Sequence, residues 1–244
     1  MGFTYVIEHM EEDDPTPRAL ARWVELEYKH MRTLAGPDSS VAFTHLSRAA
    51  SASLCATFAL ASSTSASASS LVTSPAPSTP AEAQKPQAEA KAEAECHEQG
   101  VIALMQARGI TLEKVCLLDP KASSALAPDD GDAGKFKWFL FGVRDDPPRD
   151  RTSELRAFGF PTRHLGPVQM TTDTALGVTK RVVVDRVPLE EIPYVDFPTI
   201  RFNARESVEM PFRYMIAPGT KAEPLLPPDM KAHLHADLDQ SFDF

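Results

Sequence analysis

Apolar and polar residues alternate along the chain in blocks that predict helices and strands in turn. The run "TYVIEHM" (residues 4–10) is apolar before it ends in charge, which is typical of a short buried strand. Between two prolines near residue 15 and Gly36, apolar residues recur close to the helical period of 3.6, which predicts an amphipathic helix. The apolar face of that helix is predicted to consist of Leu20, Trp23, Val24, Tyr28, Met31 and Leu34.

The same alternation continues beyond residue 96. The patterns predict a helix at 97–110, strands at 114–120 and 136–142, a helix at 152–158, a turn within 162–170, a helix at 171–187, a short strand at 189–198, and a turn with a partial helix at 206–215. Alternating strands and helices favour an α/β fold with a mainly parallel sheet.

Residues 47–95 differ from the rest in composition. They contain 15 alanines and 11 serines around the proline-rich "SPAPSTPAEAQKP". Such a segment has little apolar surface to bury, so we expect a low-complexity, disordered insertion. The single domain would then comprise residues 1–46 and 96–230, followed by an acidic C-terminal tail at 231–244 in which "HLH" carries two histidines. Without a third ligand nearby, those histidines do not indicate a metal site.

Composition restricts the classes of function. The net charge of −9 disfavours general binding to the phosphates of nucleic acid. Three cysteines without a CxxC spacing indicate a reducing compartment and no zinc site. Neither a leader peptide nor an apolar stretch of spanning length is evident, so we expect a cytoplasmic protein that does not enter a membrane.

Charge is unevenly distributed. Residues 135–186 carry ten basic and six acidic side chains, whereas residues 1–46 carry four basic and eight acidic ones. Residues 187–244 carry five basic and ten acidic side chains. A weakly basic middle between acidic ends is compatible with a bound anion in the middle and a basic partner at the ends, but charge alone favours scattered surface charge.

Polar clusters follow three of the predicted strands. They are "FGVRDDPPRDRT" (141–152), "RHLGPVQMTTDTA" (163–175), and "EEIPYVDFP" together with "ESVEMPFRY" (190–214). Ligands of open α/β sheets bind outside the carboxyl ends of the strands, so three such loops can converge on one small molecule. Each loop taken alone is better explained by a capped turn, and the occurrence of three in this order weakens that explanation.

These clusters, with "EHMEE", "WVELEY", "VCLLDP" and "DFPTIRFN", resemble one subgroup of the SPOUT methyltransferases. The subgroup includes a yeast enzyme that methylates an arginine of a small-subunit ribosomal protein. The resemblance implies an α/β fold with a C-terminal trefoil knot and S-adenosylmethionine as methyl donor. It also implies a monomer and a basic ribosomal protein as substrate.

The resemblance further implies which residues form the site, and no metal is among its requirements. The cofactor-binding residues would be Gly142, Leu165, Gly166, Gln169, Met170, Thr171 and Met210. Glu8, at the end of the first strand, is the predicted catalytic residue, because a guanidinium needs a carboxylate to orient it. Glu11 and Glu12 are predicted to attract the substrate.

Two alternatives stay open at this point. Transfer to RNA is compatible with the weakly basic middle of the chain, although the net charge speaks against it. A knotted binding module that has lost the cofactor is the other alternative, because Gly142 is the one glycine in a loop where the family has a longer glycine-rich turn.

Overall fold

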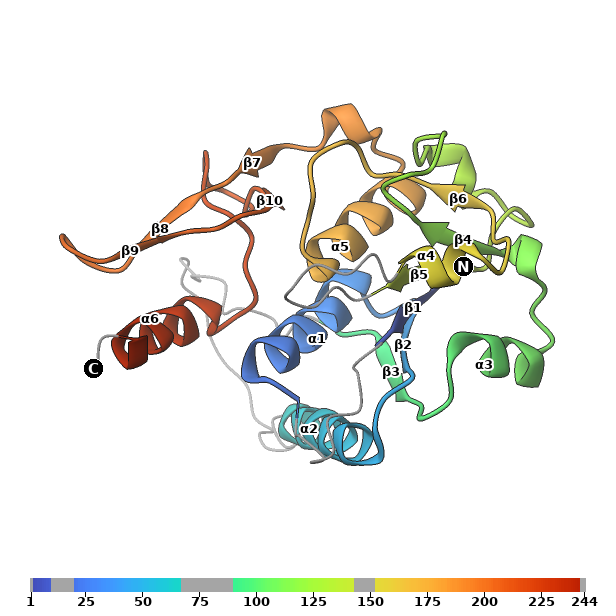
Figure 1. Ribbon diagram of the computed structural model, residues 1–244, viewed down its shortest axis with the longest axis horizontal. Coiled ribbons are helices and arrows are strands. Elements are labelled where there is room, and N and C mark those ends of the chain that lie inside the picture. The colour runs from blue at the N-terminus through green and yellow to red at the C-terminus, as the bar shows by residue number, and fades with distance from the viewer. Residues whose placement is uncertain (1, 10–19, 67–89, 143–151, 242–244) are drawn as a thin grey trace, which may run out of the picture.

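The computed structural model describes residues 2–9, 20–66, 90–142 and 152–241, and a six-stranded parallel sheet forms its centre (Figure 1). The strand order is β3-β2-β1-β5-β4-β6, and every pairing is parallel. The sheet strands are β1 Thr4–Glu8, β2 Ser40–Thr44, β3 Glu93–Cys96, β4 Val115–Leu118, β5 Trp138–Gly142 and β6 Thr162–Arg163. The predicted α/β architecture with a mainly parallel sheet is therefore confirmed, while the trefoil knot stays a prediction.

Helices cover both faces of the sheet. The α-helices are α1 Arg22–Ala35, α2 Arg48–Ala66, α3 Val101–Arg108, α4 Thr152–Arg156, α5 Thr172–Val183 and α6 Met230–Ser241, and the 3-10 turns are η1 Leu112–Lys114, η2 Pro128–Gly131 and η3 Leu189–Glu191. Successive side chains of a strand point to opposite faces. In β1, Tyr5 and Ile7 accordingly join a core with α1, α2 and α5, whereas Val6 joins a second core with α3 and α4. None of the described helices is long and apolar enough to cross a membrane.

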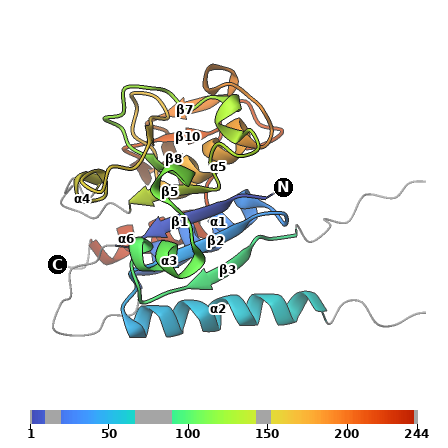
Figure 2. The same ribbon diagram turned by 90° about the vertical axis from the view of Figure 1, so that its right-hand side faces the viewer.

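The predicted disorder of residues 47–95 is wrong at both ends of the segment. Residues 48–66 form α2, which lies alongside β3 at the edge of the sheet (Figure 2). Ala50, Leu54 and Phe58 of this helix are buried in the core. Their spacing of four residues places them on one helical face. Burial of this face packs an otherwise Ala/Ser-rich helix against the core. Residues 67–89, the remainder of the predicted insertion, lie outside the described residues.

The other end of the segment belongs to the sheet. Strand β3 pairs with β2, and Ala92 just before it is fully buried. The Arg32 Nε atom of α1 also donates a hydrogen bond to the Ala92 carbonyl oxygen at 3.0 Å. Backbone pairing of this kind depends little on side-chain composition, so composition alone does not reveal it.

Helix α1 forms where it was predicted, and Leu20, Val24, Tyr28 and Met31 of the predicted apolar face are buried. Trp23 is 38% exposed, whereas Glu27 and His30 are buried. The helix contacts α5 closely, and Asp173 of α5 is the hydrogen-bond partner of His30. Polar residues that are buried by another helix cannot be recognised from apolar periodicity alone.

An antiparallel hairpin built from two successive pairs of strands projects away from the central sheet, next to α6 (Figure 1). Its strands are β7 Tyr194–Asp196, β8 Thr199–Arg201, β9 Ser207–Glu209 and β10 Arg213–Met215, with β7 paired to β10 and β8 to β9. The partial helix predicted at 206–215 is wrong, because these residues pair as strands. Exposed residues alternate with half-buried ones in β9, which is a strand pattern.

The segment predicted as an acidic C-terminal tail, residues 231–244, is helical as far as the structure describes it. Residues 230–241 form α6, and Met230 is buried. On this helix the His235 ring stacks on Phe202 of the hairpin with a centroid distance of 4.8 Å, and its Nε2 lies 3.1 Å from a Glu206 oxygen. These contacts order the segment that contains "HLH".

Candidate functional site

A cavity of about 390 Å³ lies at the carboxyl ends of β4 and β5. Its walls are the ends of these strands, α4, the loop before α5 and the first turn of α5. The lining residues are Leu118, Asp119, Pro120, Lys121, Phe141, Gly142, Thr152, Arg156, Leu165, Gly166, Pro167, Val168, Gln169, Met170, Thr172 and Ala175. Its position and size are typical of small-molecule sites in parallel α/β sheets.

Most of the predicted cofactor-binding residues meet in this cavity. Gly142, Leu165, Gly166, Gln169 and Met170 line it, although they come from two segments more than twenty residues apart. The register of the sheet and the loop that returns to α5 bring the two segments together. Their part in cofactor binding stays a prediction.

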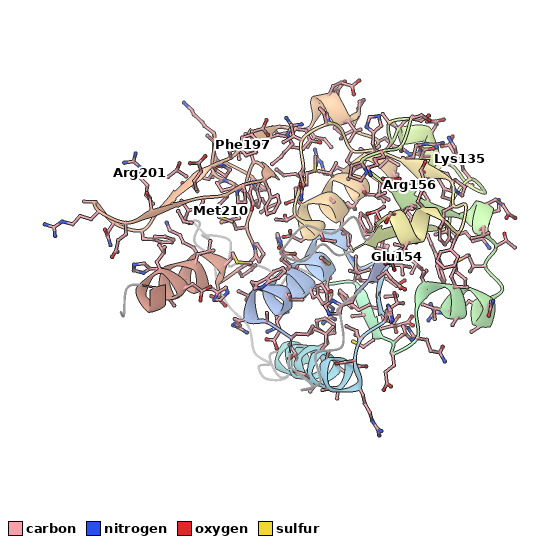
Figure 3. The ribbon with its side chains drawn as sticks, in the orientation of Figure 1. Lys135, Glu154, Arg156, Phe197, Arg201 and Met210 are labelled. Atoms are coloured by element: carbon pink, nitrogen blue, oxygen red, sulfur yellow. The ribbon has the colours of Figure 1, made fainter. Side chains whose placement is uncertain are left out.

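Two predicted cofactor-binding residues do not line the described cavity. Thr171 lies directly before α5, and its hydroxyl donates a hydrogen bond to the Thr174 hydroxyl at 2.8 Å. Met210 lies on the hairpin, well away from Arg156 at the cavity (Figure 3). The third polar cluster therefore forms the hairpin instead of a cavity wall.

The hairpin nevertheless holds the cavity loop in place. Arg213 of β10 donates its backbone N–H to the Gln169 carbonyl oxygen at 2.8 Å. The Arg213 guanidinium binds the Asp196 carboxylate through two hydrogen bonds of 2.6 and 2.8 Å. In the same loop Gly166 has a φ of +103°, a conformation that residues with a side chain rarely adopt. The loop shape therefore depends on Gly166 and on its attachment to β10.

An ion pair lies in the wall of the cavity and was not predicted from the sequence. Arg156 of α4 donates to both carboxylate oxygens of Asp119, from Nε at 2.5 Å and from Nη2 at 2.8 Å. The backbone N–H of Lys121 donates to Asp119 as well, at 2.9 Å. Asp119 directly follows the apolar run of β4, and this position at a strand end is the one sequence feature that could have indicated it.

Glu8, the predicted catalytic residue, is buried beside the site. It is paired in register with Gly142, which lines the cavity. Its Oε2 accepts hydrogen bonds from the Thr44 hydroxyl and, at 2.9 Å, from the Val101 backbone N–H at the start of α3. Burial raises the pKa of Glu8, and these two hydrogen bonds partly oppose that effect. The carboxylate therefore holds α3 and the end of β2 together, and its role toward a substrate stays a prediction.

The other predicted acidic residues cannot be placed. Glu11 and Glu12 lie outside the described residues, as do residues 143–151 of the "DDPPRDRT" loop. Thr152 is the first described residue after that loop, and it lines the cavity.

A second buried polar cluster lies between α1, α5 and β10. The His30 Nδ1 atom is 2.8 Å from Asp173 Oδ2, and both side chains are almost completely enclosed. Asp173 Oδ1 and the Tyr214 hydroxyl have no hydrogen-bond partner among the described residues. Burial, and next the charge of Asp173, raise the pKa of the neighbouring Glu27 well above its ordinary value.

A parallel α/β sheet with a mainly apolar cavity at the carboxyl ends of its strands is the arrangement typical of enzymes that bind a nucleoside-containing cofactor. Residues 4–241 match the SFM1-like family of protein arginine N-methyltransferases, and the chain belongs to this family. The family predicted from the sequence motifs is thereby confirmed.

Comparison with individual proteins gives the same result. The protein arginine N-methyltransferase SFM1 of Saccharomyces cerevisiae is 45% identical over 136 residues, which cover 53% of this chain and 62% of the yeast protein. The aligned part is thus less than two thirds of the yeast protein.

Solved structures extend the similarity over nearly the whole fold. The crystal structure of yeast SFM1 complexed with S-adenosylmethionine matches with a TM-score of 0.71 and 30% identity, over 97% of this chain and 92% of that one. The complex of the same yeast protein with S-adenosylhomocysteine matches with a TM-score of 0.67 and 29% identity, over 95% and 94% of the two chains.

The cavity of this chain fits such a cofactor. Apolar side chains from Leu118, Phe141, Leu165 and Met170 suit an adenine ring and an alkyl chain. Backbone groups of the 165–170 loop can bond to the polar edge of a base, because Gly166 keeps that loop open. The polar side chains that line the cavity are Asp119, Lys121, Thr152, Arg156, Gln169 and Thr172.

Proposed function

We propose that this protein binds S-adenosylmethionine in the cavity at the ends of β4 and β5 and methylates an arginine of a protein. The observation that carries this proposal is the convergence of five predicted cofactor-binding residues on one cavity in a chain of the SFM1-like family. When bound, the cofactor supplies an electrophilic methyl group on a sulfonium, so the chain itself has to align the acceptor nitrogen.

Acidic groups near the cavity suit an arginine acceptor. A guanidinium keeps its charge in proteins and binds carboxylates through two parallel hydrogen bonds. Glu8 is our candidate for this role, since its backbone is fixed beside Gly142 at the edge of the sheet. Glu11 and Glu12 would attract a basic segment toward the site, and this attraction would weaken with salt.

We infer a basic protein of the small ribosomal subunit as the substrate, a cytoplasmic location and a monomeric state. The net charge of −9 supports a basic protein partner over RNA. To test the acceptor, small ribosomal subunits are incubated with the protein and radiolabelled S-adenosylmethionine, and protein is then separated from RNA. Label in a ribosomal protein is expected, whereas label found in the RNA alone would contradict the proposal.

The role of the cavity is tested by binding. Gly166→Val forces a branched side chain into a backbone conformation with positive φ at the cavity wall, so we expect loss of S-adenosylmethionine binding in calorimetry. Gly219→Val is the matched control, because Gly219 has a φ of +79° with no atom near the added Cβ, and it lies away from the cavity. If the two folded variants bind the cofactor with equal affinity, this cavity is not the cofactor-binding site.

The role of Glu8 is tested by kinetics. Glu8→Gln should lower turnover on the ribosomal-protein substrate more than it weakens cofactor binding, because the amide cannot take up the charge of the guanidinium. Unchanged turnover in a folded variant would show that Glu8 stabilises the fold but does not act in catalysis.

A further inference from the structure

Two of the three cysteines lie together at the edge of the central sheet. Cys96 ends β3, and Cys55 lies on α2, the helix that runs alongside this strand (Figure 2). Successive side chains of a strand alternate between the two faces of the sheet. Ala94 and Cys96 both pack against the core that contains Leu54 and Phe58 of α2. The Cys96 side chain is therefore on the face of the sheet that α2 covers.

The two thiols are hydrogen-bonded neighbours in this position. Cys55 directly follows the buried Leu54 and is itself exposed, whereas Cys96 is half-buried. One thiol of the pair is thus open to reagents in solution, and the second lies behind it in contact with the first.

Opposing effects act on the Cys96 thiol. Burial raises its pKa, and the hydrogen bond with Cys55 acts in the same direction. The Arg32 guanidinium of α1 favours the thiolate and opposes this rise in pKa. Burial is the largest of these effects, so Cys96 is a slow nucleophile. The exposed Cys55 is therefore the thiol that reacts first with an oxidant.

The third cysteine is too far away to take part. Cys116 is completely buried in β4, and the strands β2, β1 and β5 separate β4 from β3. Neighbouring strands are about 4.8 Å apart, whereas the Cα atoms of a disulfide are at most about 7 Å apart. The fold therefore selects a single pairing, that of Cys55 with Cys96.

We propose that Cys55 and Cys96 form a reversible disulfide that fastens α2 to the edge strand β3. With glutathione disulfide as the oxidant, the Cys55 thiolate attacks one sulfur of the reagent, whose S–S bond breaks and releases one glutathione thiolate. The Cys96 thiol then gives up its proton, and its sulfur displaces the second glutathione from Cys55. In total the two cysteine thiols lose two electrons and two protons, and glutathione disulfide takes them up to become two glutathione thiols. In a reducing compartment such a bond is transient, which is the behaviour of a redox-sensing pair.

The test follows the three thiols of the full chain in glutathione buffers of increasing oxidised fraction. Free thiols are blocked by alkylation, and linked peptides are identified by mass spectrometry. Cys55→Ser and Cys96→Ser each remove one partner. Cys116→Ala is the matched control, because it removes a cysteine from another strand of the same sheet. Circular dichroism checks that each variant is folded.

We expect a link between Cys55 and Cys96 within one chain, both in the unaltered protein and in Cys116→Ala, and its complete reversal by dithiothreitol. Cys96→Ser should instead retain glutathione on Cys55, because no second thiol displaces it. The linked protein should melt about 4 °C or more above its reduced form, since the bond restricts the unfolded chain. The oxidant should not raise the melting temperature of Cys96→Ser.

Three results would overturn the proposal. The first is glutathione that stays on Cys55 of the unaltered chain while Cys96 remains free. The second is a link that joins Cys55 only to a second copy of the chain. The third is a linked protein that melts no higher than its reduced form, because the bond would then not hold α2 against β3.

Discussion

Two buried acidic sites of this molecule differ in how their carboxylates are bonded. Glu8 lies at the edge of the sheet, where the Thr44 hydroxyl and the N–H at the start of α3 both donate to it. Asp173 lies between α1 and α5 with His30 on one oxygen, and its other oxygen has no partner among the described residues. The first site joins elements through backbone and hydroxyl donors, whereas the second depends on one histidine. We infer that the second site tolerates substitution less well.

The largest effect is expected from removing that histidine. His30→Leu leaves Asp173 buried without its partner, which should lower the free energy of unfolding by about 3–5 kcal/mol. The measurement is chemical denaturation at neutral pH. His45→Leu is the control at the other site, since His45 is exposed and lies 3.8 Å from Glu8. If both histidine variants lose the same stability, the two sites do not differ in the way described.

A smaller loss is expected at the other site. Glu8→Ala removes the acceptor for the Thr44 hydroxyl and the Val101 N–H, which should destabilise the fold by about 2 kcal/mol. Thr44→Val removes one of the two donors and should cost about half as much. A loss for Glu8→Ala as large as that for His30→Leu would contradict the ranking.

The pH dependence of stability should separate the two sites further. Because the pKa of Glu27 is raised on folding, the folded state binds more protons than the unfolded state above the ordinary glutamate value of 4.5. The contribution of Glu27 is present below that value and is lost as the pH rises toward the raised pKa. Glu27→Gln removes this dependence.

Relative to the unaltered chain, Glu27→Gln should gain stability between about pH 5 and about pH 8. Denaturation curves at the two pH values give this difference directly. Parallel stability profiles for the variant and the unaltered chain would show that Glu27 ionises as it does in the unfolded state.

The smallest effect is expected for Tyr214→Phe. The Tyr214 hydroxyl is buried without a partner among the described residues, so its removal should change stability by less than about 1 kcal/mol and can raise it. Thermal unfolding is sensitive enough for this comparison. A loss above about 2 kcal/mol would reveal a hydrogen bond from this hydroxyl that is essential to the second site.

Much of the central sheet could be predicted from the sequence. Strand β4, residues 5–7 of β1 and residues 138–141 of β5 are uninterrupted apolar runs, as expected for strands that are buried on both faces. Strand β3 contains two glutamates and no such run, and its place is set by pairing with β2. Helix α2 was not predicted because its composition is rich in Ala and Ser, although Ala50, Leu54 and Phe58 have helical spacing.

The candidate site could be predicted only in part. The family motifs indicate Gly142, which ends strand β5. They also indicate the loop 165–170, whose residues follow one another in the sequence. The Asp119–Arg156 pair joins residues from different elements, so only the folded chain brings it together. Met210 was assigned to the cavity because it lies within a motif, whereas the hairpin carries it elsewhere.

The edge strand β3 bears on how copies of this protein behave toward each other in concentrated solution. An unpaired strand edge is a template for the strands of other molecules, and natural proteins protect such edges with charge and short length. Strand β3 is four residues long and carries Glu93 and Glu95. Glu95 is paired with His97 and Arg108, so Glu93 is the glutamate of β3 that would bring like charge toward an approaching copy. The acidic strand would thus serve colloidal stability, and replacing both glutamates with valine would create an aggregation-prone edge.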